Sequence, residues 1–208
     1  SSIRRINVPP KRRASSQLKR AVRTPPIWRY PVGLGAKRKR GAFMRGTISQ
    51  MKHCSFVYTR TMQGKKTRRL ETMLQGAIRH FPELQGESIS VGYTKRYGES
   101  DIRRLLIRLN PRRLSYYVIG HELTHLVQGM KDRLGENAIP KGEIACDIWT
   151  IARADVFLDE PPGYLDVGRR VLLDWKAHRD RVRNLCIEAI ERRNVHRHYI
   201  QWLTRELR

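Results

Sequence analysis

Two histidines and a glutamate stand at a spacing that could bind and use a metal ion. The chain reads HELTH at residues 121–125, so His121 and His125 are four positions apart, with Glu122 beside the first. On a helix, residues i and i+4 project from the same face, and two imidazoles placed there can reach one zinc ion. A glutamate next to the first ligand does not bind the metal but accepts a proton from the metal-bound water. The sequence therefore predicts a hydrolytic zinc site, with His121 and His125 as ligands and Glu122 as the base.

A catalytic zinc ion needs a third protein ligand, and its fourth position stays open for water. Glu143 follows His125 by 18 positions and falls at the start of the next predicted helix. Asp147 comes one helical turn later on the same face, where it could accept the outer N–H of a ligand histidine and fix its tautomer. We therefore expect Glu143 as the third ligand and Asp147 as the support of a histidine ligand. Asp132 and Glu136, in the loop between the two helices, are the alternative third ligands.

The helices that must position these residues are visible in the apolar pattern. A helix is predicted over 115–128, ending at Gly129, and a second over roughly 141–158, just after Pro140. An earlier amphipathic helix is predicted over 67–81. Its apolar residues recur at helical spacing, and they are Leu70, Met73, Leu74, Ala77, Ile78 and Phe81.

Short β-prone runs predict a small sheet beside these helices. The runs at 54–59, 88–94 and 105–109 are strand candidates, and the stretch 97–101 has the composition of a turn. We therefore expect the second and third of these strands to form a hairpin. Residues 166–208 predict one long helix or two. The fold class expected is α+β.

The HELTH motif and the GEIACD sequence, which carries ExxxD at 143–147, together resemble the gluzincin pattern of zinc metallopeptidases. The likeness is to the minimal gluzincins, in which a small domain carries the two helices and a short sheet. A weaker similarity is to SprT-like zincins. It rests on residues 107–110 and on residues 117–120, which lead into HELTH. Those families mostly use a third histidine, whereas the next histidine here is His178. The resemblance covers about residues 67–158.

The resemblance implies a zincin-like domain with zinc as its cofactor and a peptide or protein as its substrate. The substrate would pair its backbone with an edge strand, by analogy the strand at 105–109. Peptide hydrolysis also requires a group that stabilises the oxyanion. His178, His196 and Tyr164 are candidates for that group, and the sequence does not select among them.

Basic charge is concentrated in the first third of the chain. The net charge is +24, and residues 1–70 hold 20 of the 43 Lys and Arg residues but no Asp or Glu. Such a segment binds polyanions, because each cation placed on a phosphate releases counterions. Residues 1–46 contain many prolines and glycines and have little apolar periodicity, so we expect an extended basic arm. The expected nucleic-acid contacts are Lys11, Arg12, Arg13, Arg29, Lys37, Arg38, Lys39 and Arg40.

Arg29 lies between Trp28 and Tyr30, which could stack on exposed bases or anchor the arm to the rest of the chain. We therefore expect three regions: the arm at 1–46, the zincin-like domain at 47–165 and a helical extension at 166–208. RNA is favoured over DNA as the partner of the arm.

Other features narrow the class of protein. There is no apolar run near 18 residues and no secretory h-region, so neither a membrane span nor a signal peptide is expected. The three cysteines, Cys54, Cys146 and Cys186, are an odd and sparse set that fits a reducing interior. These observations predict an intracellular, nucleic-acid-associated protein.

The residue patterns favour two function classes. The first is a zinc metalloprotease held on nucleic acid or a nucleoprotein by its basic arm. The alternative is a non-enzymatic RNA- or DNA-binding component of a ribosome or virion, in which the zincin domain is vestigial. A protease that matures proteins of a phage or mobile element is a third class, which no residue pattern favours.

Overall fold

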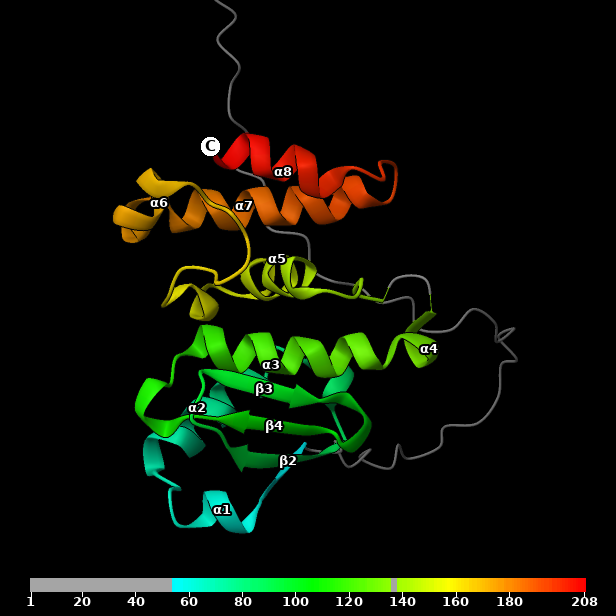
Figure 1. Ribbon diagram of the computed structural model, residues 1–208. Helices are drawn as coiled ribbons and strands as arrows, with labels where there is room; N and C mark the ends of the chain where they lie inside the picture. Colours follow the sequence, from blue (N-terminus) through cyan, green and yellow to red (C-terminus); the bar gives the residue numbers. More distant parts are fainter. Residues whose placement is uncertain (1–53, 136–137) are drawn as a thin grey trace, which may run out of the picture. The chain divides into compact units, whose positions relative to one another are not determined.

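A mixed sheet of four short strands forms one layer of the protein (Figure 1). The computed structural model describes residues 54–135 and 138–208, all of which lie in a unit that spans Ile48–Arg208. The strands are β1 (Ser55–Tyr58), β2 (Ser88–Tyr93), β3 (Gly98–Asp101) and β4 (Leu106–Leu109), in the spatial order β1-β2-β4-β3. β2 runs parallel to both β1 and β4, and β3 is antiparallel to β4.

The sheet corrects two expectations. β2 and β4 do not form a hairpin, because they are parallel neighbours; the stretch expected to be a turn contains strand β3, which pairs with β4. The strand at 105–109 is also not an edge strand, since β4 lies between β2 and β3. Among the described strands the edge beside helix α3 is β3, which contacts that helix directly.

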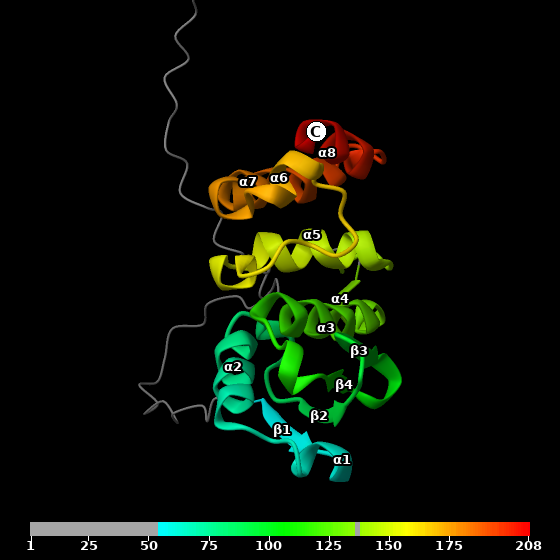
Figure 2. The same cartoon turned by 60° about the vertical axis from the view of Figure 1, so that its left-hand side comes forward.

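The helices lie on one another in layers that begin at the sheet. α3 (Tyr116–Gly129) covers the sheet and contacts α5 (Glu143–Arg153), which in turn contacts α7 (Trp175–Arg193) and, through it, α8 (Tyr199–Leu207). Figures 1 and 2 show this succession from two directions. The other helices are α1 (Arg60–Gln63), α2 (Arg68–Ile78), α4 (Lys131–Leu134) and α6 (Arg169–Leu173).

Side-chain caps explain where two of the predicted helices, α2 and α3, begin. The Thr67 hydroxyl accepts a hydrogen bond from the Leu70 amide at 3.1 Å and starts α2, and the Ser115 hydroxyl accepts one from the Val118 amide at 3.1 Å and starts α3. Each cap satisfies an amide that has no partner within its helix. The α2 helix buries the apolar face that the sequence predicts, and α3 is buried over most of its circumference.

The α+β fold class is confirmed, and two helix predictions need adjustment. The second predicted helix ends at Arg153, after which the short 3-10 helix η5 (Asp155–Leu158) completes the segment. The C-terminal region holds three helices, α6 to α8, where one or two were expected. No helix in 54–135 or 138–208 has both the length and the apolar character needed to span a membrane.

The expected basic arm lies outside the described residues. This applies to all of its nucleic-acid-binding candidates, which are Lys11, Arg12, Arg13, Arg29, Lys37, Arg38, Lys39 and Arg40. Glu136, one of the alternative metal ligands, also lies outside the described residues.

Candidate metal centre

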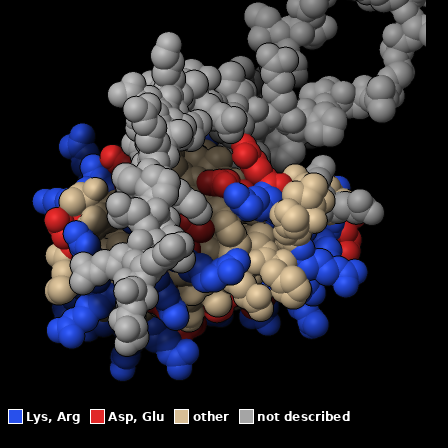
Figure 3. Space-filling view, turned by 90° about the horizontal axis from the view of Figure 1, so that it is seen from above, with Lys and Arg blue, Asp and Glu red and all other residues tan. Residues whose placement is uncertain are grey.

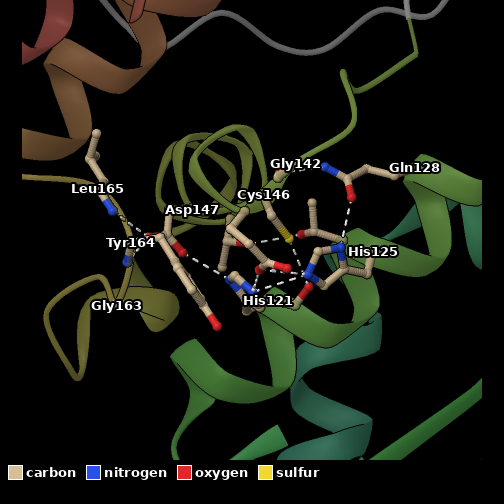
Figure 4. Close-up of polar contacts among 12 residues, drawn as sticks. His121, His125, Gln128, Gly142, Cys146, Asp147, Gly163, Tyr164 and Leu165 are labelled. Carbon is tan, nitrogen blue, oxygen red and sulfur yellow. Dashed lines mark hydrogen bonds and ion pairs between the residues drawn. The ribbon is translucent and has the colours of Figure 1, made fainter. Parts of the chain in front are cut away.

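Three ligand-type atoms from helices α3 and α5 converge at one point. Figure 4 shows the two histidines of this group side by side on α3. The Nε2 atoms of His121 and His125 on α3 lie 3.2 Å apart. The Oε2 atom of Glu143, the first residue of α5, lies 3.0 Å from the first nitrogen and 3.1 Å from the second. The structure therefore brings together the three residues for which the sequence predicts a shared metal ion.

These separations fit a small ion bound by all three atoms. A zinc ion about 2.0–2.2 Å from each of three ligands in a tetrahedron places the ligand atoms roughly 3.3 Å apart. The observed edges of 3.0 to 3.2 Å are close to that value. A carboxylate oxygen could accept an N–H from each histidine, but the two Nε2 atoms could not also share a proton with each other while both donate, whereas one metal ion satisfies all three short contacts.

Asp147 lies behind His121 and is completely buried. Its Oδ1 atom is 2.9 Å from His121 Nδ1 and also accepts a hydrogen bond from the Tyr117 hydroxyl. Its Oδ2 atom accepts hydrogen bonds from the amides of Tyr164 and Leu165, at 2.7 and 2.8 Å. This is the position expected for a carboxylate that fixes a histidine tautomer with Nε2 free for metal.

Asp147 also affects the electrostatics of the site. Burial, the largest influence, lowers the pKa of His121, but the hydrogen bond and the charge of Asp147 outweigh it and leave that pKa raised. Burial raises the pKa of the Tyr117 hydroxyl, and the neighbouring charge of Asp147 raises it further. Tyr117 therefore stays protonated and continues to donate to the carboxylate.

Gln128 plays the corresponding part for His125. Its Oε1 atom lies 2.7 Å from His125 Nδ1, and its Nε2 donates to the carbonyl oxygens of Pro140 and Gly142, at 2.7 and 3.1 Å. These last two bonds fix which end of the amide faces the histidine. They also tie the end of α3 to the loop that leads into Glu143.

Glu122 lies against strand β3. Only 6% of the residue is exposed, and its Oε2 atom is buried without a hydrogen-bond partner among the described residues. Burial raises the pKa of Glu122 to about 7, with His121 acting in the opposite direction. A Cβ atom at Gly98 would collide with the Glu122 carboxylate, so the glycine is what allows β3 to cross this side chain. An unpartnered buried carboxylate oxygen beside the ligand cluster is suited to a proton that arrives on a bound water.

The buried thiol of Cys146 completes a group of His121, His125 and Cys146 that could hold a metal ion, since their ligand atoms lie within 4.8 Å of one another. The thiol donates to the His121 carbonyl oxygen at 3.1 Å and thus points at the backbone of α3. Burial raises its pKa well above the usual value, and the charge of Asp147 adds to that effect. Glu143 has the better geometry as a third ligand, because its oxygen contacts both histidine nitrogens directly.

Of the other metal-ligand and oxyanion candidates that the structure describes, only Tyr164 lies at the site. Asp132 is exposed on α4 and makes no contact with the cluster. His178 lines a cavity between α6 and α7, and His196 is exposed after α7, so neither lies at the site. Tyr164 does: its ring stacks on that of His121 with centroids 5.6 Å apart, while 58% of the residue stays exposed.

Sequence reasoning missed several supporting residues of this site. Tyr117 and Gln128 lie on α3 at i−4 from His121 and i+3 from His125, so helical spacing alone could have indicated them. Asp159 was also missed; its carboxylate accepts from the amides of Tyr116 and Tyr117, at 2.7 and 2.9 Å, and caps α3. The contacts of Asp159 cross more than 40 residues of chain, and no local pattern signals them.

Comparisons with known proteins give no independent guide to this site. No protein-family model matches the chain, and no curated protein or solved structure matches it either.

Proposed function

We propose that this protein is a zinc-dependent metallopeptidase with a gluzincin-like domain, which its basic arm holds on nucleic acid or on a nucleoprotein assembly. The observation that carries the proposal is the meeting of His121 Nε2, His125 Nε2 and Glu143 Oε2 within 3.0–3.2 Å of one another. The buried Glu122 beside them supports the hydrolytic part of the proposal, because a purely structural zinc site needs no free carboxylate.

Each residue has a distinct role in this proposal. Bound by His121, His125 and Glu143, zinc would polarise a carbonyl and lower the pKa of a water to about 7. Glu122 takes the proton from the attacking water and passes it to the leaving amine. Asp147 holds His121 in the tautomer that leaves Nε2 free, and Gln128 does the same for His125.

The substrate is proposed to bind as an extended peptide along β3. β3 lies at the edge of the sheet and passes over Glu122, so a strand added there would place a peptide bond near the cluster. Of the three oxyanion-stabilising candidates, Tyr164 is supported by its position, because its exposed ring lies directly on His121.

Metal analysis of the purified full-length protein tests the ligand set. We expect about one zinc per chain after dialysis, and loss of that zinc in His125→Ala and Glu143→Ala proteins. Cys146→Ser is the matched variant, and it should retain the metal. Zinc retained by Glu143→Ala but lost from Cys146→Ser would replace Glu143 by the thiol as third ligand.

Hydrolysis of an unfolded protein such as casein tests the chemistry. Glu122→Gln should keep zinc and lose activity by roughly 10²–10⁴-fold, the usual contribution of a positioned acid–base group. The control is Glu160→Gln, which changes an exposed carboxylate away from the cluster. Equal cleavage by wild type and Glu122→Gln would rule out the proposed mechanism.

The alternative, a non-enzymatic component of a nucleoprotein, is favoured by one observation: residues 1–70 hold 20 Lys and Arg and no acid. Co-sedimentation with RNA at increasing salt tests it. When binding depends on phosphate contacts, the logarithm of the binding constant falls linearly with the logarithm of the salt concentration. The alternative predicts strong, salt-dependent binding together with no hydrolysis by the zinc-loaded protein. The metallopeptidase proposal predicts both activities.

A further inference from the structure

A concave site lies away from the candidate metal centre, among the C-terminal helices. A cavity of about 510 Å³ is bounded by the segment before α6, by α6 and α7, and by the end of α8. Its charged and titratable lining residues are Asp166, Arg169, Arg170, His178, Arg181 and Arg208. The lining therefore contains four arginines and one histidine but a single side-chain carboxylate, that of Asp166.

That carboxylate is already neutralised within the protein. Asp166 accepts a hydrogen bond from Arg208 at 2.8 Å and one from the Gly168 amide at 3.1 Å. The Arg208 guanidinium and the Gly168 amide together lower the pKa of Asp166, which keeps its charge. Arg208 and Asp166 thus cancel each other as an ion pair.

The other three arginines have no acidic partner in the parts of the chain that the structure describes. Arg181 donates to the carbonyl oxygen of Glu206 at 2.7 Å, which orients its guanidinium but leaves the charge uncompensated. Arg169 and Arg170 make no ion pair with any described carboxylate and are exposed at the start of α6. Figure 3, which views the protein from the α8 side, shows mostly Lys and Arg side chains along the left, lower and right margins of the described surface.

This arrangement has the chemistry of an anion site. A guanidinium presents a planar fork of N–H donors that matches the oxygens of a phosphate, and charge-assisted bonds of this kind are short and strong. Several guanidinium groups around a hollow concentrate their field within it, which raises the local concentration of anions. A volume of about 510 Å³ holds a phosphate group together with part of the molecule that carries it.

We propose that the cavity between α6, α7 and the end of α8 binds a phosphate group through Arg169, Arg170 and Arg181. The phosphate belongs either to a small phosphorylated molecule or to the backbone of a nucleic acid, and both present the same oxygens. The proposal does not depend on the metal centre and does not involve the basic arm.

Titration of the ¹⁵N-labelled full-length protein with inorganic pyrophosphate and with a short oligoribonucleotide tests the proposal. The Gly168 amide, which lies in the lining, is the local reporter. We expect it to shift with saturation on addition of at least one probe. A shift with pyrophosphate assigns a small phosphorylated ligand, and a shift with the oligonucleotide alone assigns a backbone phosphate. No shift with either probe overturns the proposal.

Paired variants separate this site from general attraction to a basic protein. Arg169→Gln/Arg170→Gln should weaken binding at the Gly168 reporter at least tenfold. The control Arg79→Gln/Arg103→Gln removes the same charge from exposed positions outside the cavity and should change binding less than twofold. Equal weakening by both pairs would show a non-specific effect and reject the site. Arg169→Lys/Arg170→Lys, which keeps the charge but loses the fork, should bind more weakly than wild type.

Discussion

The carboxylate of Asp147 joins three segments of chain at the scale of single residues. Tyr117 and His121 come from α3, Asp147 itself from α5, and the amides of Tyr164 and Leu165 from the following loop. Four donors on two oxygens leave the group fully satisfied despite complete burial, as a buried charge requires. The position of His121 is thus fixed by contacts that extend well beyond the metal ligands.

Replacing this carboxylate should weaken the metal site without removing a ligand. In Asp147→Asn, one oxygen becomes an NH₂ group, which cannot accept from the donors that now face it. We expect the affinity for zinc to fall 10–100-fold, as measured by competition with a chelator. The control is Asp180→Asn, at an exposed position on α7, which should leave the affinity unchanged. An unchanged affinity in both variants would contradict the role given to Asp147.

Gly98 provides a test that is specific to Glu122. In Gly98→Ala the new methyl group would displace the Glu122 carboxylate, while His121, His125 and Glu143 keep their positions. Displacement of a reacting group by about 1 Å costs on the order of 10² in rate. We therefore expect peptide hydrolysis to fall about 100-fold with the zinc content unchanged. Gly64→Ala, at a glycine with nothing within 4 Å of the added atom, should keep full activity.

A site residue could be predicted from the sequence when it lies in a local motif or at helical spacing from another site residue. His121, Glu122 and His125 form a local motif, and Glu143 with Asp147 follows from helical spacing on the next helix. The two amides that complete the environment of Asp147 could not be predicted, because any backbone amide can donate and only the folded loop places these two.

At the scale of elements, the contact between α3 and α5 holds the candidate metal centre together. Gly120 on α3 faces both α5 and the following η5; a Cβ atom there would be 2.6 Å from Phe157 of η5 and 2.9 Å from Thr150 of α5. One turn on, the Thr124 hydroxyl bonds to that of Thr150 at 2.8 Å. Because the histidines lie on one helix and Glu143 on the other, the spacing of the helices sets the distance between ligands.

Enlarging Gly120 should therefore affect stability and the metal site together. Gly120→Ala overpacks the contact between the helices, and we expect the free energy of unfolding to fall by about 1–3 kcal/mol. Urea denaturation followed by circular dichroism measures it. Gly64→Ala has the same chemistry without the collision and should be neutral or stabilising by up to about 1 kcal/mol. Equal stability of the two variants would argue against tight helix packing at Gly120.

Strand β3 shows why some strands could not be predicted from the sequence. Its residues, Gly98–Asp101, contain no large apolar side chain, and their composition is typical of a turn. The strand forms because its backbone pairs with β4, which follows four residues later, and because Gly98 leaves room for Glu122, which lies 24 residues further along the chain. The α2 and α3 helices, in contrast, carry their own caps and apolar faces and could be predicted closely.

The distribution of charge is a property of the whole molecule. Residues 1–70 contain 20 basic and no acidic side chains, whereas the remaining residues hold all 19 acids. Any long-range attraction to a polyanion would therefore act mainly on residues 1–70, while the candidate metal centre lies in the part of the chain whose charge is more nearly balanced.

Neutralising one basic cluster should change the salt dependence of RNA binding by a calculable amount. Replacing Lys37, Arg38, Lys39 and Arg40 by Gln removes up to four phosphate contacts. The slope of log K against log salt should then become shallower by about 3, since each contact on single-stranded RNA contributes about 0.7. Filter binding at several salt concentrations measures the slope.

The control for this experiment replaces four exposed basic residues elsewhere, which are Arg79, Arg103, Arg112 and Lys131. It removes the same charge and should leave most of the slope in place. An equal loss of slope in the two proteins would mean that RNA responds to total charge and not to the arm.

The way Asp147 is held has a consequence for protein synthesis. A ribosome releases the N-terminal residues first, so the two histidines, Glu143 and Asp147 all emerge before Tyr164 and Leu165, whose amides satisfy the carboxylate. A nascent chain halted after Asp147 and before Tyr164 would contain every candidate metal ligand. It would still lack the two amides that donate to the Asp147 carboxylate. The basic segment 1–70 would by then have left the ribosome. If the proposed function holds, the order of synthesis therefore allows polyanion binding before peptide hydrolysis.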